Sequence, residues 1–429
     1  MAIEFEEKWE DYVPTPKTDI DGRDEYEKDY DKIIFSQCFR RLSGKTQVHP
    51  FSHNDHVHTR LSHSLEVSIV GRSIVKELVL LNVIPPKKEQ DCIKIVMSAG
   101  IAHDMGNPPL GHTGEDAIGS WVKSHSDELV KLKISQDCVN TYFSYDGNAQ
   151  NFHIFNNLEY FEEKGLSYAT TAALVKYPKI SSDKNPKAGF FKADQDKFDE
   201  VFDALKLKKN GFPFRHPLSY VMEAADDICY SMMDVDDAYE MGIHGNTTKI
   251  QDIAETELGI SKNSDNIFGE IRAKRGILTS KAVKGAAEAF KKNLHYIMDG
   301  NVSDFAGEPV PNDKKDLIVM GKDSNDALKL ISLLKKFAAE NVFGQRDKVV
   351  YETACYSIIG TIFDSWLKAY SEYKQENPSL QSKKVFSLMN LDDSKRDDEA
   401  LIQIIDYVSG MTDRFAKFTA DTLSGRLSV

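Results

Sequence analysis

Five side chains between residues 60 and 115 constrain this chain more than any other feature, because they bring imidazole and carboxylate groups together at short spacing. They are His63, the adjacent pair His103 and Asp104, and then His112 and Glu115. Imidazole nitrogens and carboxylate oxygens together suit a divalent transition ion, Mg²⁺ or Mn²⁺. The stretch therefore predicts a metal site whose last ligand comes from elsewhere in the chain.

Apolar residues at helical spacing flank these side chains. Residues 64–81 and 91–102 both show the pattern of an amphipathic helix. The apolar stripe expected on the first helix consists of Leu65, Ile69, Ile74 and Leu78. His63 stands at the start of the first helix, and the pair His103 and Asp104 at the end of the second. Adjacent residues on a helix point in different directions, so the pair can share one ion only in a crevice between packed helices.

The chain is expected to turn back directly after this pair. Gly106, Pro108 and Pro109 break the second helix. The turn then brings His112 and Glu115 toward the site on the next element.

One later helix offers the missing ligand. Within residues 216–241, Asp226, Tyr230 and Asp234 follow one another at intervals of four, so they share one helix face. Asp227 is the neighbouring alternative, but it lies off that face. The expected metal ligands are therefore His63, His103, Asp104 and Asp226.

Four longer motifs occur in one order along the first half of the chain. They are FRRLSGKTQV at 39–48, RLSHSLEV at 60–67, HDMGNPPLGHTGE at 103–115 and MEAADDICYSMMD at 222–234. Together they resemble the bacterial deoxyguanosine triphosphate triphosphohydrolases of the HD-domain superfamily. An HD doublet alone is a weak signal, whereas four long motifs in the order of the family are a strong one.

The resemblance implies an all-α fold, with an HD-type helical core and extra C-terminal helices. We expect a lead-in over residues 1–30, the catalytic core over 31–245, and C-terminal helices over 246–429 that complete the pocket and the oligomer contacts. A linker is expected at 299–313. The only strand structure that we allow for is a short hairpin around 186–192.

The activity that the resemblance implies is metal-dependent hydrolysis of a dNTP, with dGTP preferred, to a deoxynucleoside and inorganic triphosphate. The expected cofactor is Mn²⁺ or Mg²⁺. Attack falls on the α-phosphorus, and the 5′-oxygen that leaves needs a proton. His112, one turn before Glu115, is the natural acid–base partner, and Glu115 would orient it. The residues leave open whether His112 protonates the leaving group or positions the water.

The resemblance also implies a set of substrate contacts. They are Gln47 and Asp234 at the sugar 3′-hydroxyl, Arg60 at the nucleotide, and Asn148, Lys176 and Tyr177 at the phosphates. Lys187 is a further candidate for phosphate binding, and Lys184 is an equally good charge nearby. Tyr230 would pack against the deoxyribose and fill the space that a 2′-hydroxyl needs. His153 stands where the family usually carries Arg, which leaves its role open.

The net charge of −13 argues against broad binding of nucleic acid or anionic membranes. A polyanionic substrate therefore needs local positive charge, from a metal and a few placed Lys and Arg side chains. No run of 18 apolar residues predicts a membrane-spanning helix, and the acidic N-terminus does not read as a secretory signal. Five single cysteines without a CxxC pair fit reduced thiols. A cytoplasmic protein is expected.

The expected partners are the dNTP substrate and further copies of the chain, with a hexamer favoured. A second dNTP as activator stays open, and single-stranded nucleic acid is not predicted. Two other interpretations remain. One is a different HD phosphohydrolase that acts on a cyclic dinucleotide, (p)ppGpp or a nucleoside monophosphate. The other is a non-catalytic protein that senses dNTPs or binds single strands.

Overall fold

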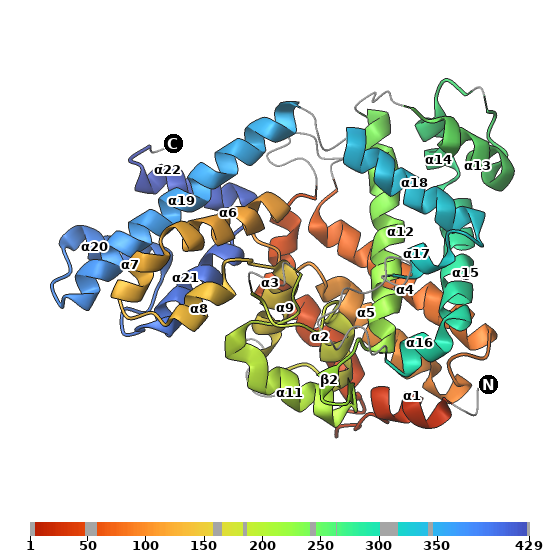
Figure 1. The fold of residues 1–429 in the computed structure, drawn as a ribbon, viewed down its shortest axis with the longest axis horizontal. Coiled ribbons are helices and arrows are strands. Elements are labelled where there is room, and N and C mark those ends of the chain that lie inside the picture. The colour runs from red at the N-terminus through yellow and green to blue at the C-terminus, as the bar shows by residue number, and fades with distance from the viewer. Residues whose placement is uncertain are drawn as a thin grey trace.

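The computed structural model describes residues 5–47, 58–157, 165–182, 187–240, 246–262, 264–300, 316–341 and 346–426. Within these ranges the chain is a set of packed α-helices, and the only sheet is a two-stranded ribbon (Figure 1). The all-α prediction is confirmed. Nearly all of the expected linker at 299–313, and Lys184 with it, lies outside the described residues. No described helix is both long and apolar enough to cross a membrane.

A layer of helices at the centre of the molecule supports the predicted site. Its members are α2 (Glu25–Phe35), α4 (Arg60–Leu80), α5 (Glu89–Ala102), α10 (Tyr168–Leu174) and α12 (Pro217–Glu240). Helix α4 packs against both α5 and α12, and α5 also contacts α2 and α10. The long α12 runs through the middle of Figure 1 and agrees closely with the helix predicted over 216–241.

The buried face of α4 differs from the predicted stripe. Ile74 and Leu78 are buried as expected, but the prediction is wrong for Leu65 and Ile69, whose exposed fractions are 40% and 45%. Helix α4 contacts α5, α12 and also α15, so its apolar residues do not form a single stripe. Its closest approach to α5 uses small residues: a Cβ on Gly100 would lie 2.8 Å from the backbone of Ser68.

A second group of helices packs on one side of this layer and shares its hydrophobic core. It consists of α13 (Thr248–Leu258), α14 (Ile267–Ala273), α15 (Arg275–Lys292), α16 (Leu294–Met298), α17 (Leu317–Gly321) and α18 (Asp326–Asn341). Helices α14 and α18 lie against α12, and α15 lies against α4. The layer is therefore covered along α12 by residues from the second half of the chain.

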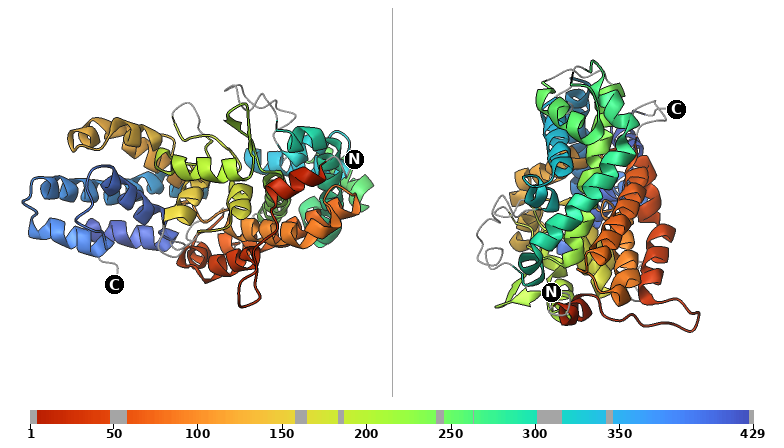
Figure 2. Two further views of the ribbon diagram at one scale, coloured as in Figure 1. Left: turned by 90° about the horizontal axis from the view of Figure 1, so that it is seen from below. Right: turned by 90° about the vertical axis from the view of Figure 1, so that its right-hand side faces the viewer.

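A third group has a hydrophobic core of its own and joins distant parts of the chain. It consists of α6 (Gly111–Ser124), α7 (Ser126–Lys131), α8 (Gln136–Thr141), α19 (Arg346–Lys374), α20 (Leu380–Met389), α21 (Asp398–Ser409) and α22 (Asp413–Leu423). Trp121 of α6 stacks on Phe363 of α19 at 4.7 Å between ring centroids. Figures 1 and 2 show this group at the end of the molecule opposite α13–α17. Helix α6 thus carries His112 and Glu115 on the C-terminal core.

The remaining elements connect these groups. They are α1 (Glu6–Tyr12), α3 (Gln37–Arg41), η1 (Leu42–Gly44), η2 (Pro86–Lys88), α9 (Gly147–Asn157), η3 (Lys192–Asp194), α11 (Gln195–Ala204), β1 (Lys208–Lys209) and β2 (Phe212–Pro213). The hairpin lies at 208–213 rather than around 186–192, where Phe190 makes only an isolated bridge with Ile180. Its turn residues Asn210 and Gly211 have φ of 52° and 82°, the left-handed pair that tight hairpins favour.

His153 acts as a buried cation between elements. Its Nδ1 lies 2.9 Å from Asp194 at the end of η3, and its Nε2 lies 3.4 Å from Asp406 on α21. Burial alone would lower the pKa of His153, but Asp406 and Asp194 raise it to about 10. His153 therefore ties α9 to the C-terminal core with the positive charge that an arginine would supply.

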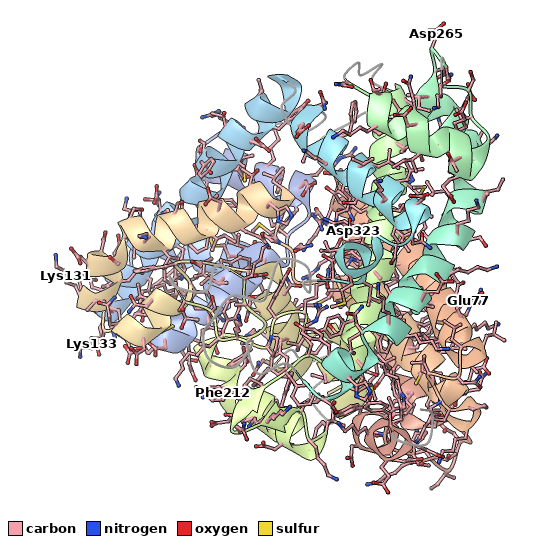
Figure 3. The ribbon with its side chains drawn as sticks, turned by 45° about the vertical axis from the view of Figure 1, so that its right-hand side comes forward. Glu77, Lys131, Lys133, Phe212, Asp265 and Asp323 are labelled. Atoms are coloured by element: carbon pink, nitrogen blue, oxygen red, sulfur yellow. The ribbon has the colours of Figure 1, made fainter. Side chains whose placement is uncertain are left out.

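Charged side chains on the periphery point away from the helices. Figure 3 labels Lys131 and Lys133 at one end of the molecule and Asp265 at the other, and all three are exposed. Charged groups such as these are solvated outside the cores. The charged groups that are buried call for a separate explanation, and many of them lie in one cavity.

Candidate active site

A polar cavity of about 430 Å³ opens between α12 and the two hydrophobic cores. The predicted site residues that line it are Gln47, Arg60, His63, His103, Asp104, His112, Glu115, Asn148, Lys176, Tyr177, Lys187, Asp226 and Tyr230. Asp234 is the exception: it is buried two turns beyond Asp226 and does not line the cavity. Segments far apart in the sequence therefore meet at one place.

Three of the four predicted metal ligands converge. The ligand atoms of His63, His103 and Asp226 all lie within 4.8 Å of one another. His63 Nε2 is 3.0 Å from Asp226 Oδ1, and His103 Nε2 is 3.5 Å from the same oxygen. The two imidazole rings meet edge to face at 5.3 Å between centroids.

The helix ends that carry the histidines set their orientation. Thr59 caps α4 by accepting a hydrogen bond from the backbone N–H of Ser62, which fixes His63 in the first turn. His103 follows the last residue of α5, and its Nδ1 donates to the carbonyl of Gly100 at 2.8 Å. When the ring is neutral, as a metal ligand must be, that bond leaves Nε2 as the nitrogen with a lone pair, facing the site. This nitrogen is buried without a hydrogen-bond partner among the described residues.

These observations fit a divalent cation better than a purely structural cluster. Two imidazole nitrogens and a carboxylate oxygen are an ordinary ligand set for such an ion. A buried acceptor without a donor costs free energy, and a cation between His103, His63 and Asp226 would satisfy it.

Asp104, the fourth predicted ligand, lies at the edge of this cluster. Its Oδ1 is 3.5 Å from His103 Nε2 and accepts from Asn107 Nδ2 at 2.6 Å. Its Oδ2 accepts from Arg60 at 2.8 Å and from Gln47 at 3.1 Å. Burial alone would raise the pKa of Asp104, but Arg60 lowers it well below its ordinary value. Arg60 and Gln47, predicted as substrate contacts, thus also hold a predicted ligand.

Lys176 forms a buried ion pair with Asp226. Its Nζ donates to Asp226 Oδ2 at 2.6 Å. Burial would lower the pKa of Lys176, but Asp226 and Glu223 raise it above its ordinary value. Helix α10 ends at Leu174, so Lys176 and Tyr177 lie beyond its C-terminal end. The extended backbone after α10 directs both toward the cavity.

His112 and Glu115 lie one turn apart at the start of α6, as predicted. His112 Nδ1 is 2.8 Å from Glu115 Oε2, and Glu115 Oε1 accepts from the backbone N–H of Gly147 at 2.8 Å. Burial would raise the pKa of Glu115, but His112 and the Gly147 N–H lower it. The His112 side chain is 82% exposed and the Glu115 side chain 12%. A fixed carboxylate therefore orients an imidazole that faces the open cavity.

The predicted sugar and phosphate contacts occupy other parts of the wall. The Tyr230 ring meets His63 edge to face at 6.3 Å between centroids, one helical turn along α12 from Asp226. Asn148 is held by Asp146, which accepts from its side chain at 2.8 Å. Lys187 is exposed at the rim.

Several lining residues were not predicted from the sequence. They are Thr46, Asn107, Leu110, Gly111, Thr113, Glu223, Asp227, Asp316, Lys335, Tyr351 and Glu352. Lys335 of α18 pairs with Asp227 at 2.5 Å, so the off-face neighbour of Asp226 reaches the cavity as well. Only the position of Glu223, one turn before Asp226 on α12, was readable from helical spacing. Lys335 and Asp316 come from elements that pack on α12, and no local sequence pattern predicts this packing.

Carboxylates outnumber cations among the described lining residues. The cations are Arg60, Lys176, Lys187 and Lys335, and the carboxylates are Asp104, Glu115, Glu223, Asp226, Asp227, Asp316 and Glu352. Placed Lys and Arg side chains alone therefore do not make the cavity basic. A polyanion that enters it needs bound cations as well.

Comparisons with known proteins identify the family of the chain. Residues 322–421 match the family model of the phosphohydrolase-associated domain. A deoxyguanosinetriphosphate triphosphohydrolase-like protein of Pseudomonas aeruginosa is 32% identical, over 97% of this chain and 96% of its own length. One of Synechocystis sp. is 33% identical over 94% of each chain. The deoxyguanosinetriphosphate triphosphohydrolase of Yersinia pseudotuberculosis is 28% identical over 85% of this chain and 81% of its own.

The two relatives above 30% identity span nearly the whole chain. The matched domain at 322–421 covers much of the C-terminal core that carries α6. The chain therefore belongs to the deoxyguanosinetriphosphate triphosphohydrolase family of the HD-domain superfamily.

Proposed function

We propose that the protein hydrolyses deoxynucleoside triphosphates, with dGTP preferred, to a deoxynucleoside and inorganic triphosphate. The observation that carries this proposal is the convergence of His63, His103 and Asp226 with the pair His112 and Glu115 in one cavity. The names of the relatives support the substrate class.

In this proposal a divalent metal, Mn²⁺ or Mg²⁺, is held by His63, His103 and Asp226, with Asp104 beside them. Such an ion supplies Lewis acidity at a phosphoryl oxygen and lowers the pKa of a bound water. Arg60, Gln47 and Asn107 fix Asp104 through hydrogen bonds at 2.6 to 3.1 Å. These neighbours keep the site organised before substrate arrives.

The reaction adds water to the α-phosphorus and breaks its bond to the 5′-oxygen, which takes up a proton. His112 is the proposed acid–base group. It either protonates the 5′-oxygen or positions the water, and Glu115 keeps its Nε2 directed into the cavity through the bond to Nδ1. Loss of His112 should therefore affect turnover and leave metal binding intact.

The proposed phosphate contacts are Lys176, Tyr177, Lys187, Asn148 and Arg60. Lys176 balances the charge of Asp226 in the structure at hand. A metal at Asp226 would take over that role, so the ammonium group becomes free to bind a phosphate oxygen as a point charge. Lys335, paired with Asp227 on the same wall, adds positive charge near this end of the cavity.

The proposed sugar pocket consists of Tyr230 with Gln47 and Asp234, although Asp234 does not line the cavity. A preference for guanine has a candidate in Glu352, which lines the cavity together with Tyr351 of α19. Guanine carries two adjacent N–H donors on its pairing edge, and a carboxylate is the acceptor that matches both. The proposal includes a homo-oligomer with a hexamer favoured, which light scattering after gel filtration would measure.

The test is product analysis of the pure protein with Mn²⁺ or Mg²⁺ and each of the four dNTPs and GTP, singly and in pairs. Deoxynucleoside and tripolyphosphate in equal amounts, produced fastest from dGTP, are expected. A His112→Asn variant should bind metal normally and turn over about a hundredfold to ten-thousandfold more slowly. Activity only in nucleotide mixtures would reveal a required activator.

Other products would contradict the proposal. Pyrophosphate or a monophosphate would place the chain with other HD phosphohydrolases. Nucleotide binding without turnover in any mixture would instead favour a sensing protein.

A further inference from the structure

The turn that leads into α6 adopts an unfavourable backbone conformation just before His112. Leu110 and Gly111 both lie in the left-handed region, with φ of 66° and 61°. Glycine adopts this conformation readily, whereas leucine does so only at a cost in free energy. Leu110 is also buried. Something outside the turn must therefore hold Leu110 in place.

The contact that holds Leu110 comes from the far end of the chain. The backbone N–H of Leu110 donates to Asp413 Oδ1 at 2.9 Å. Asp413 is the first residue of α22, and only 2% of it is exposed. Its other oxygen accepts from the backbone N–H of Thr46 at 3.0 Å and from Thr46 Oγ1 at 2.8 Å. One buried carboxylate thus joins α22, the segment at Thr46 and the turn before α6.

A second contact joins the turn before α6 and the segment at Thr46 to the end of α21. The buried Nζ of Lys45 donates to the carbonyl of Asn107 at 2.5 Å and to the carbonyl of Ser409 at 2.7 Å. The Asn107 side chain in turn donates to Asp104. A Cβ on Gly44 would lie 2.7 Å from the side chain of Thr412, so the segments are in close contact. The C-terminal core therefore holds both ends of the loop between Asp104 and His112.

We propose that Asp413 is a positioning residue that acts through Leu110 to set the place of His112 and Glu115. The proposal rests on the proposed function, in which His112 is the acid–base group. Asp413 does not line the cavity, so it acts through the two segments that it holds, the turn at Leu110 and the backbone at Thr46. Lys45 holds the other end of the loop at Asn107 in the same way.

The central variant is Asp413→Asn, which keeps the size of the side chain. Its amide has one oxygen, so it can no longer accept from Leu110 on one side and from Thr46 on the other. Thr46→Val removes one hydrogen bond to the same carboxylate and leaves the Leu110 bond intact. Asp421→Asn removes a carboxylate from the same helix, where it pairs with Lys417 near the surface.

The expected result is a fall in kcat of about tenfold to a hundredfold for Asp413→Asn, because small displacements of catalytic groups have effects of this size. KM and metal content should stay at the wild-type values. Asp421→Asn should keep the wild-type kcat. Leu110→Gly in the Asp413→Asn background should restore part of kcat, since glycine holds the left-handed conformation unaided.

A purely structural role would give a different result. If Leu110→Gly fails to restore kcat, or if folded Asp413→Asn keeps the wild-type kcat, the proposal is wrong. Hydrogen exchange of peptides covering residues 105–116 supplies a readout that does not depend on activity. Faster exchange in Asp413→Asn but not in Thr46→Val is expected, and equal exchange in both variants would overturn the proposal even if the wild type hydrolyses no nucleotide.

Discussion

At the scale of single residues, buried charge determines what each side chain of this protein can do. Asp226 is the clearest case: burial would raise its pKa, but Lys176, His103 and His63 lower it well below the ordinary value. It therefore remains a carboxylate, which a metal ligand must be. His153, away from the cavity, is a second buried group whose charge is stabilised by its neighbours. It is a cation between Asp194 and Asp406.

His153 should make the stability of the protein depend on pH. Its pKa is raised from 6.5 to about 10 in the folded chain, so folding favours the protonated ring. This contribution is fully present below pH 6.5 and is lost as the pH rises toward 10. Thermal unfolding of wild type and His153→Arg as a function of pH measures this effect. The Tm of wild type should fall relative to that of His153→Arg over this pH range, because the guanidinium of the variant stays charged. If the two plots of Tm against pH run parallel, His153 does not carry this charge.

Tyr230 should control discrimination between deoxyribose and ribose. The ring lies one turn from Asp226 and faces the cavity beside His63. A wall that fills the space of a 2′-hydroxyl rejects ribonucleotides by steric clash. The ratio of kcat/KM for dGTP over GTP should therefore fall in Tyr230→Ala and stay high in Tyr230→Phe. An unchanged ratio in Tyr230→Ala would remove Tyr230 from this role.

At the scale of elements, the sequence predicts helices that have a strong local pattern, but it does not predict which face of a helix is buried. Helix α12 was predicted within a residue at each end, because its apolar spacing is regular and long. The exposure of Leu65 and Ile69 on α4 was not predicted, because α4 contacts helices on several sides. Local periodicity cannot say which apolar face meets which neighbour.

The close packing of the turn after α5 against α9 gives a prediction at this scale. A Cβ on Gly106 would lie 2.2 Å from the carbonyl oxygen of Gly147 and 2.3 Å from the backbone nitrogen of Asn151. Gly106→Ala should lower the free energy of unfolding by about 1–3 kcal/mol and reduce activity.

Gly360 in α19 is the matched control, because no described atom outside its own stretch of helix backbone lies within 4 Å of the Cβ position. Gly360→Ala should stabilise the protein by about 0.5–1 kcal/mol, since alanine loses less entropy in a helix. Urea unfolding measures both values. Equal effects of the two substitutions would contradict the packing described at Gly106.

At the scale of the whole molecule, the site depends on contacts between parts of the chain that are hundreds of residues apart. The sequence identified just over half of the described residues that line the cavity. It could not show that α6 packs on α19–α22, or that Lys335 and Glu352 reach the cavity. These contacts depend on tertiary packing, and the spacing of residues in the sequence does not predict them.

Binding of the proposed metal should stabilise the whole fold, because the three proposed ligands that converge come from α4, the end of α5 and α12. A ligand present at a hundred times its Kd adds about 2.7 kcal/mol. A chelator should lower Tm, and Mn²⁺ should restore it. His103→Ala should show no such shift, and a shift of wild-type size in that variant would place the metal elsewhere.

The most direct measurement is turnover of dGTP in water enriched in ¹⁸O, followed by ³¹P NMR and mass spectrometry of both products. Attack at the α-phosphorus predicts one ¹⁸O atom on a terminal phosphorus of tripolyphosphate and none in deoxyguanosine. Label in the nucleoside would contradict attack at the α-phosphorus, and monophosphate and pyrophosphate as the products would contradict release of the intact triphosphate.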